Sequence, residues 1–247
     1  AAAARAGAAG RLRAAVWGDL RDSRVGKGPA LVFHVGARRA SATLVSPRPE
    51  AVAAGEGGGV LASRTALNAG GETLDVAIVD RLADDFLSAH AIDLRQDPLA
   101  LSRLLDAAER ARHELSAAPS TQVNLPFITA DHTGPKHLQR DFGRAELDAL
   151  SDAGPLGAAV VALCEGALED AGVAKEDVAA LVLTGGAMRA PHLRARVEEA
   201  VGLRAVEVAL SPEDLGVSGA ALQDLAAAAL SRTSAGSEGA AQADTAS

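Results

Sequence analysis

The chain has 247 residues, 48% of them hydrophobic, which is enough to bury the core of one large domain or two modest ones. Only 2% of the residues are aromatic, so the core is expected to consist of Ala, Val and Leu. The formal net charge of −8 argues against direct nucleic-acid binding, because contacts to phosphate groups require a basic surface.

The start of the chain and the single cysteine bear on its location. Residues 1–18 carry three arginines and no acidic residue, a composition shared by organellar transit segments and by plain helices. The first residue is Ala and the only methionine is Met188, so a processed product or a fragment is expected. Cys164 lies in an apolar stretch, which predicts a buried, inert thiol in a reducing compartment. No apolar run reaches the roughly 18 residues of a membrane span.

The first half of the chain predicts a hairpin followed by two helices. Residues 30–35 and 40–45 read as two apolar strands joined at Gly36, and a further strand is predicted at 60–63. From Glu72 onward, apolar side chains recur every four residues, which predicts a helix. Asp97 and Pro98 then supply the N-cap and first turn of a second helix that runs to residue 116.

The second half adds strands and helices in alternation. Residues 120–129 read as a strand pair ended by a turn at 131–137. Helices are predicted from residue 143 and over 156–172, the latter closed by a glycine. Residues 178–202 read as strand, Gly-Gly turn and helix, and the last helix is placed at 218–230, before a polar tail. This alternation indicates an α/β protein.

Two glycine pairs and an arginine pair are the first candidates for a ligand site. Gly185 and Gly186 follow a buried strand and open a helix, where backbone N–H groups can approach a phosphate; tight packing alone would also explain them. The same alternatives apply to the turn at residues 70–71. Arg38 and Arg39, at the hairpin tip, could contact a phosphate or be simply solvated.

Metal and acid/base chemistry receive little support from the sequence. His132 and His137 lie on a loop without a nearby cysteine or carboxylate cluster, so no metal site is expected. Glu109 and Glu114 read as residues on a helix surface and not as an acid/base pair.

A long collinear stretch carries a family resemblance. "QDPLALSRLLDAAERARHELSAAPSTQVNLPFITADHTGPKHL" closely resembles the nucleotide-binding domain of the 70-kDa heat-shock chaperones of the DnaK type, in their bacterial and organellar branch. "AGGETLDVAIVDRLADDF" is similar to the family's Leu-Gly-Gly-Glu-Asp-Phe-Asp helix start, and "VLTGGAMRAPHL" to its Val-Gly-Gly-Ser-Thr-Arg-Ile-Pro segment. With "LSPEDLGVSGAAL", the resemblance extends from about residue 14 to about residue 230.

The resemblance implies an actin-like, ribonuclease H-like ATPase fold, in which ATP lies between two lobes. This chain matches only the second lobe; the first lobe and the peptide-binding domain are expected to be missing. The implied boundaries are an N-terminal segment at 1–28, a lower α/β subdomain at 29–71 and 144–231, an upper helical/β subdomain at 72–143, and a disordered tail at 232–247.

The implied phosphate loop departs from the family pattern. The family reads Asp-Leu-Gly-Gly-Gly-Thr-Phe-Asp where this chain has "HVGARRAS", with one glycine, Gly36. His34 and Ser41 replace the two acids that would organise magnesium, and Arg38 and Arg39 stand where glycine and threonine are implied. Because phosphoryl transfer depends on positioning and electrostatics, no hydrolysis, catalytic residue or metal is expected.

The implied nucleoside side is better preserved. Residues that match adenosine-contacting positions lie on one predicted helix and around the Gly-Gly turn: Glu109, Arg112, His113, Ser116, Gly185, Gly186 and Arg189, with Glu213 in the final motif. No cofactor is expected, with weak ATP or ADP binding as the alternative. Packing of the helix against the turn would also account for these residues.

These features predict a non-catalytic remnant of a chaperone ATPase domain that acts as a structural or adaptor subunit of a large, organellar assembly. Protein partners are expected to cover the surface that the first lobe would occupy. The alternatives are an ATP-binding fragment of a genuine ATP-dependent chaperone, and a docking surface at 72–143 for a nucleotide-exchange factor. The expected location is the mitochondrial matrix, with chloroplast stroma or bacterial cytoplasm as alternatives.

Overall fold

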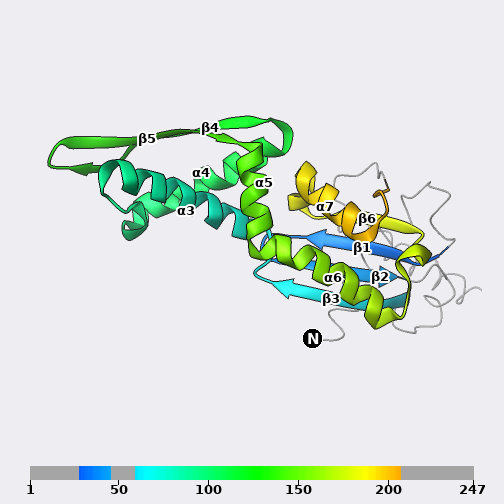
Figure 1. Ribbon diagram of the computed structural model, residues 1–247. Helices are drawn as coiled ribbons and strands as arrows, with labels where there is room; N and C mark the ends of the chain where they lie inside the picture. The colour runs from blue at the N-terminus through cyan, green and yellow to red at the C-terminus, as the bar shows by residue number, and fades with distance from the viewer. Residues whose placement is uncertain (1–27, 46–58, 207–247) are drawn as a thin grey trace, which may run out of the picture.

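The computed structural model describes residues 28–45 and 59–206, which form a sheet unit and a helical unit (Figure 1). The predicted helix at 218–230, the N-terminal segment, the tail and Glu213 lie outside these residues.

The sheet unit contains four strands in the order β3-β2-β1-β6. Strands β1 (Ala30–Val35) and β2 (Arg39–Val45) form the predicted antiparallel hairpin, and β1 runs parallel to β6 (Ala180–Thr184). The prediction for β3 was too short: the strand covers Val60–Leu67 and pairs with β2 as far as Arg39. Most side chains of this edge strand are exposed, so its sequence does not alternate regularly between apolar and polar residues. The predicted strand therefore ended at residue 63.

Helices α6 (Pro155–Ala171) and α7 (Pro191–Val201) pack on this sheet. Leu31, Phe33 and Leu181 of the sheet are fully buried together with apolar side chains of α6 and α7. Helix α6 ends at Gly172 in the left-handed conformation (φ 63°), as its position predicted. Two short 3-10 helices lie on either side of β6: η3 (Lys175–Asp177) before it and η4 (Gly186–Arg189) after it.

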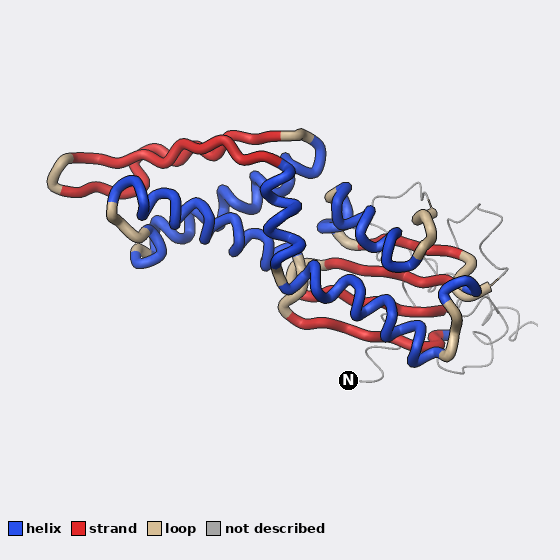
Figure 2. The backbone as a smooth tube through the Cα atoms, in the orientation of Figure 1, coloured by secondary structure: helices blue, strands red, loops and turns tan. Residues whose placement is uncertain are grey.

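The helical unit consists of α3 (Gly71–His90) and α4 (Pro98–Ala117), joined by the 3-10 helix η2 (Leu94–Gln96), and a long two-stranded sheet beside them (Figure 2). The four-residue apolar spacing predicted from Glu72 is confirmed: all its members are buried, namely Leu74, Ile78, Leu82 and Phe86. Strand β4 (Ser120–Asp131) pairs with β5 (Gly134–Gly143). The predicted strand pair within 120–129 was therefore wrong, because its polar, Pro-containing sequence is one strand whose partner follows the turn.

Helix α5 (Arg144–Ala153) links the two units and contacts helices of both. Among the described residues, no single helix is long and apolar enough to cross a membrane, although α5 and α6 together, bent by 61°, have suitable length and composition. Cys164 of α6 is fully buried, as predicted. Burial raises the pKa of its thiol to about 12, so the reactive thiolate is not formed near neutral pH.

Candidate functional site

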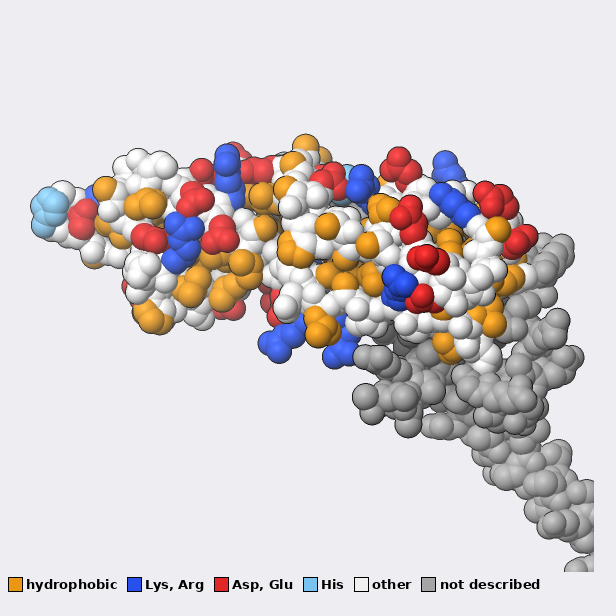
Figure 3. All heavy atoms as spheres, turned by 60° about the horizontal axis from the view of Figure 1, so that its bottom comes forward, with side chains coloured by type: hydrophobic (Ala, Val, Ile, Leu, Met, Phe, Trp, Pro, Cys, Tyr) orange, Lys and Arg blue, Asp and Glu red, His pale blue; other side chains and the backbone are white. Residues whose placement is uncertain are grey.

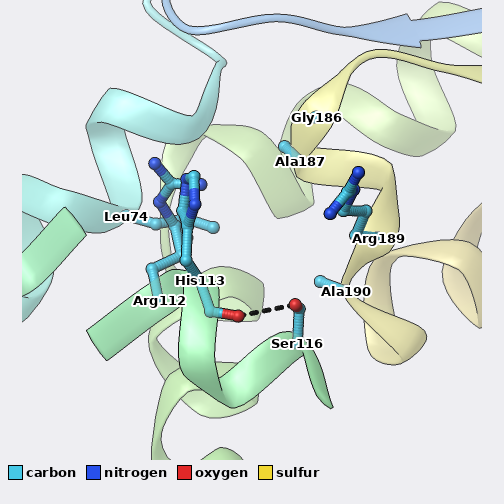
Figure 4. Close-up of a pocket in the computed structure, with 8 residues that line it drawn as sticks. All are labelled: Leu74, Arg112, His113, Ser116, Gly186, Ala187, Arg189 and Ala190. Carbon is cyan, nitrogen blue, oxygen red and sulfur yellow. Dashed lines mark hydrogen bonds between the residues drawn. The ribbon is translucent and has the colours of Figure 1, made fainter. Parts of the chain in front are cut away.

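A pocket lies between α4 and the connection from β6 to α7 (Figure 4). Its volume is about 170 Å³, and it brings together segments that are some seventy residues apart in sequence. The lining residues are Leu74, Arg112, His113, Ser116, Gly186, Ala187, Arg189 and Ala190. Five of the predicted nucleoside-side residues are among them. Glu109 and Gly185 are not, although both lie on the same two segments.

Arg112 is held in place by an acid that the sequence did not single out. Its Nε donates to Asp75 Oδ1 at 2.6 Å and its Nη2 donates to Asp75 Oδ2 at 3.1 Å. The two side chains are only 13% and 10% exposed, whereas Glu109 is 63% exposed and 3.9 Å from the guanidinium. Asp75 lies three residues before Ile78 on the buried face of α3, so an acid inside an apolar stripe was the available signal.

The other two α4 residues that line the pocket, His113 and Ser116, contribute polar groups to it. Ser116 Oγ donates to the backbone carbonyl of His113 at 2.6 Å, one turn earlier in the helix. His113 is exposed beside Arg112. Figure 4 shows these two basic side chains on the α4 side of the pocket, with Arg189 on the η4 side.

Backbone geometry requires glycine at the first position of the Gly-Gly turn, Gly185, but not at the second. Gly185 has φ 91°, and a Cβ added there would lie 2.2 Å from the Val35 carbonyl oxygen. Any other residue would therefore push β1 and β6 apart at their ends. A Cβ at Gly186 would meet no atom within 4 Å. Gly185 thus serves the strand-to-helix packing, while Gly186 lines the pocket.

The pocket favours a ligand that is anionic or has an extended π system. Two arginines and a histidine surround it, and guanidinium groups bind phosphate oxygens and stack on aromatic rings. Its volume is below the roughly 300–1,000 Å³ of typical small-molecule sites. The described residues by themselves therefore enclose only part of a nucleotide-sized ligand.

The predicted phosphate loop is the turn between β1 and β2, and its carbonyl groups are bound to the start of α3. Gly71 N–H donates to Gly36 O at 2.9 Å and Glu72 N–H donates to Ala37 O at 2.8 Å. A Cβ at Gly70 would lie 2.3 Å from Ala37 O, so the contact is close. The α3 N-terminus is thereby satisfied by protein carbonyls and not by an anion.

His34 occupies the end of β1 between the two glycine turns. Its Nδ1 lies 3.0 Å from Thr184 Oγ1, and its ring is within 3.1 Å of the positions that a Cβ would take at Gly36 and at Gly185. Burial, and then the positive charge of Arg39, lower the pKa of His34, which favours the neutral ring. Ser41 is the cross-strand neighbour of His34 in β2, so neither position offers a carboxylate.

Arg38 and Arg39 lie on the outside of this turn and do not line the α4 pocket. Arg38 Nε binds both carboxylate oxygens of Glu72, at 2.9 and 3.2 Å, in a pair whose side chains are 81% and 49% exposed. Figure 3 shows basic groups projecting where the two units meet. Within the described ranges, no group of three or more His, Cys, Asp or Glu side chains is placed to hold a metal ion.

A second hollow, of about 570 Å³, lies beside the turn. Arg38 and Glu72 are at its rim, and Val76, Ala77 and Pro155 contribute its apolar surface. Val76 is 49% exposed and nearby Leu67 of β3 is 73% exposed, so apolar surface faces solvent here.

The fold and the pocket define a mixed α/β protein with a basic cleft where a helical unit meets a sheet unit. Comparison with known proteins identifies the family: the model of the family described as "Hsp70 protein" matches residues 54–235. The chain therefore belongs to the Hsp70 family, and its described part is a mixed α/β structure within the nucleotide-binding region of that family.

Curated relatives agree with this assignment. The chain is 44% identical over 154 residues to two proteins named "Chaperone protein DnaK", from Halobacterium salinarum strains ATCC 29341 / DSM 671 / R1 and ATCC 700922 / JCM 11081 / NRC-1. Each alignment covers 62% of this chain and 24% of the relative. The matched region thus spans about a quarter of the length of these relatives.

Proposed function

We propose that this chain is a second lobe of an Hsp70-type nucleotide-binding domain that does not hydrolyse ATP and acts as a structural or adaptor lobe for protein partners. In this proposal, residues 29–71 and 144–231 form the lower subdomain of an actin-like fold, and residues 72–143 form the upper one. The observation that carries it is the β1–β2 turn, where His34 and Ser41 stand in place of acids.

The chemistry of this turn supports the proposal that the chain does not hydrolyse ATP. Magnesium prefers carboxylate and water oxygens, which a half-buried imidazole and a serine hydroxyl do not replace. His34 is bound to Thr184, and Arg38 is paired with Glu72. Without a positioned metal, the transferring phosphoryl group loses its main electrostatic support.

The α4 pocket supports residual, weak binding of ATP or ADP through the adenosine. Arg112, His113, Ser116, Gly186 and Arg189 line it together. Because these groups can contact only part of the ligand, the affinity is expected to be low and independent of magnesium. The Arg112–Asp75 pair also joins α4 to α3, so the same residues contribute to packing.

Partner binding is proposed for the apolar surface around the second hollow. Leu67 and Val76 are exposed there, and exposed apolar patches often mark protein interfaces. A large assembly is the proposed setting, with a nucleotide-exchange factor on residues 72–143 as a further partner. The mitochondrial-matrix location stays a prediction.

The test is calorimetric titration of the chain with ATP and ADP, in magnesium and in EDTA, together with a phosphate-release assay. We expect weak binding that is equal in both buffers, and no release of phosphate. The double variant His34→Asp/Ser41→Asp should introduce a magnesium dependence, because it places two carboxylates at adjacent strand positions. Tight, magnesium-dependent binding by the unmodified chain would contradict the proposal.

The second candidate is a fragment of a genuine ATP-dependent chaperone. The assembly of five predicted nucleoside-side residues in one pocket favours it. The same titration separates the two candidates, because a genuine ATP site requires magnesium for tight binding and a non-hydrolysing lobe does not.

A further inference from the structure

Strand β4 contains an irregularity that presents an aromatic side chain to solvent. Its pairing with β5 shifts register between Leu125 and Thr129, and Phe127 within this bulge has φ 52°. A positive φ is unfavourable for a bulky residue, so the surroundings must hold it. The Phe127 side chain is 66% exposed, while its neighbour Ile128 is buried.

Two side chains from different elements hold this bulge. Arg103 of α4 donates to the carbonyl oxygens of Phe127 and Pro126 at 2.9 and 2.8 Å. From the opposite strand, His137 Nδ1 accepts a hydrogen bond from the Phe127 N–H at 3.0 Å. The two rings also meet edge to face, with their centroids 4.7 Å apart.

The hydrogen bond from Phe127 depends on the protonation state of His137. Nδ1 can accept only while it carries no proton; in the imidazolium, both ring nitrogens are donors, and two N–H groups would face each other. The charged groups next to this site are Arg103, which donates to the bulge, and Lys136, which precedes His137 in β5 and whose Nζ is 3.6 Å from Asp131. Within the part of the chain that the structure describes, no carboxylate is bound to His137 that would compensate for the lost hydrogen bond.

We propose that His137 and Phe127 form a proton-sensitive latch on the helical unit. Neutral His137 holds Phe127 in its strained, outward conformation; protonation of Nδ1 breaks the bond and lets the bulge relax. The latch does not depend on nucleotide and goes beyond the adaptor role proposed above. The exposure of the Phe127 ring on the protein surface would then change with pH.

The experiment measures hydrogen exchange of the Phe127 amide in the full chain by NMR, corrected for the intrinsic exchange rate, at about pH 7.5 and about pH 5. Loss of one hydrogen bond predicts about a tenfold fall in protection at the lower pH. The amide of Val123, in the regular part of β4, serves as the reference and should keep its protection.

Two substitutions make the test specific. In His137→Asn, an amide oxygen can take the place of Nδ1 but does not titrate, so protection of Phe127 should be the same at both pH values. In His137→Gln, the polar group lies farther out, near the Nε2 position, so protection should be low at both. Three results would each overturn the latch. The protection of Phe127 in the wild type could be the same at both pH values, His137→Asn could show the same pH dependence as the wild type, or Val123 could lose as much protection as Phe127.

Discussion

The α4 pocket and the β1–β2 turn are two neighbouring regions that differ in how their charged residues are held. In the pocket, Arg112 and Asp75 form a bidentate pair with side chains only 13% and 10% exposed. At the turn, Arg38 and Glu72 form a pair with side chains 81% and 49% exposed. The first region contains residues predicted for the nucleoside side, and the second contains the predicted, altered phosphate loop. The difference shows that an ion pair between two packed helices is shielded from water, while a pair at the turn is largely solvated and contributes less to stability.

The largest expected effect concerns the backbone on which both regions depend. Gly185→Ala should lower the free energy of unfolding by at least about 3 kcal/mol, because it combines a positive φ with a clash against the Val35 carbonyl. Gly186→Ala, one residue later, meets no neighbour and should change it by less than about 1 kcal/mol. Urea unfolding followed by circular dichroism measures both; similar values would show that the turn is more adaptable than its geometry indicates.

The next effect separates the two ion pairs. Arg112→Ala leaves the largely buried Asp75 carboxylate without its partner and should cost about 3 kcal/mol in the same unfolding assay. Arg38→Ala removes an exposed pair and should cost less than about 1 kcal/mol. Equal losses would contradict the view that packing distinguishes the regions.

The smallest effect concerns His34 and appears as a pH dependence. Its folded-state pKa is lowered by burial and by Arg39 from the ordinary value of 6.5, so the unfolded chain binds the proton first as the pH falls. Stability is therefore unaffected by this group well above pH 6.5 and decreases below it, by at most about 1.4 kcal/mol per pH unit, until the folded-state pKa is reached.

The variant His34→Asn provides the control, since Asn can keep a hydrogen bond to Thr184 without titrating. Between about pH 7 and pH 5, the wild type should lose more stability than this variant. Carboxylates with lowered pKa, such as Asp93 and Asp170, lose their contribution only at lower pH, near and below about 4. Parallel profiles for wild type and variant would remove His34 as the cause.

The elements that were predicted correctly are those encoded by local sequence. Asp97 caps α4 by accepting from the N–H groups of Leu99 and Ala100, at 2.9 and 3.4 Å, as its position before Pro98 predicted. Three other features were also predicted from local sequence: the pairing of the β1–β2 hairpin, the buried face of α3 and the glycine that ends α6. Each depends on residues within a few positions of one another. The candidate pocket was located in part, through the resemblance of α4 and the Gly-Gly turn to a known family.

Tertiary structure decided the contacts between distant positions. The sequence analysis did not single out Asp75, and only the packing of α3 against α4 places it on Arg112. The His34–Thr184 contact depends on the parallel pairing of β1 with β6, and the strained Phe127 depends on Arg103 and His137 from two other elements. Periodicity and capping residues determine where a helix or strand forms. The partner of each polar side chain is determined by how these elements pack, because a buried polar group must find a hydrogen-bonding partner.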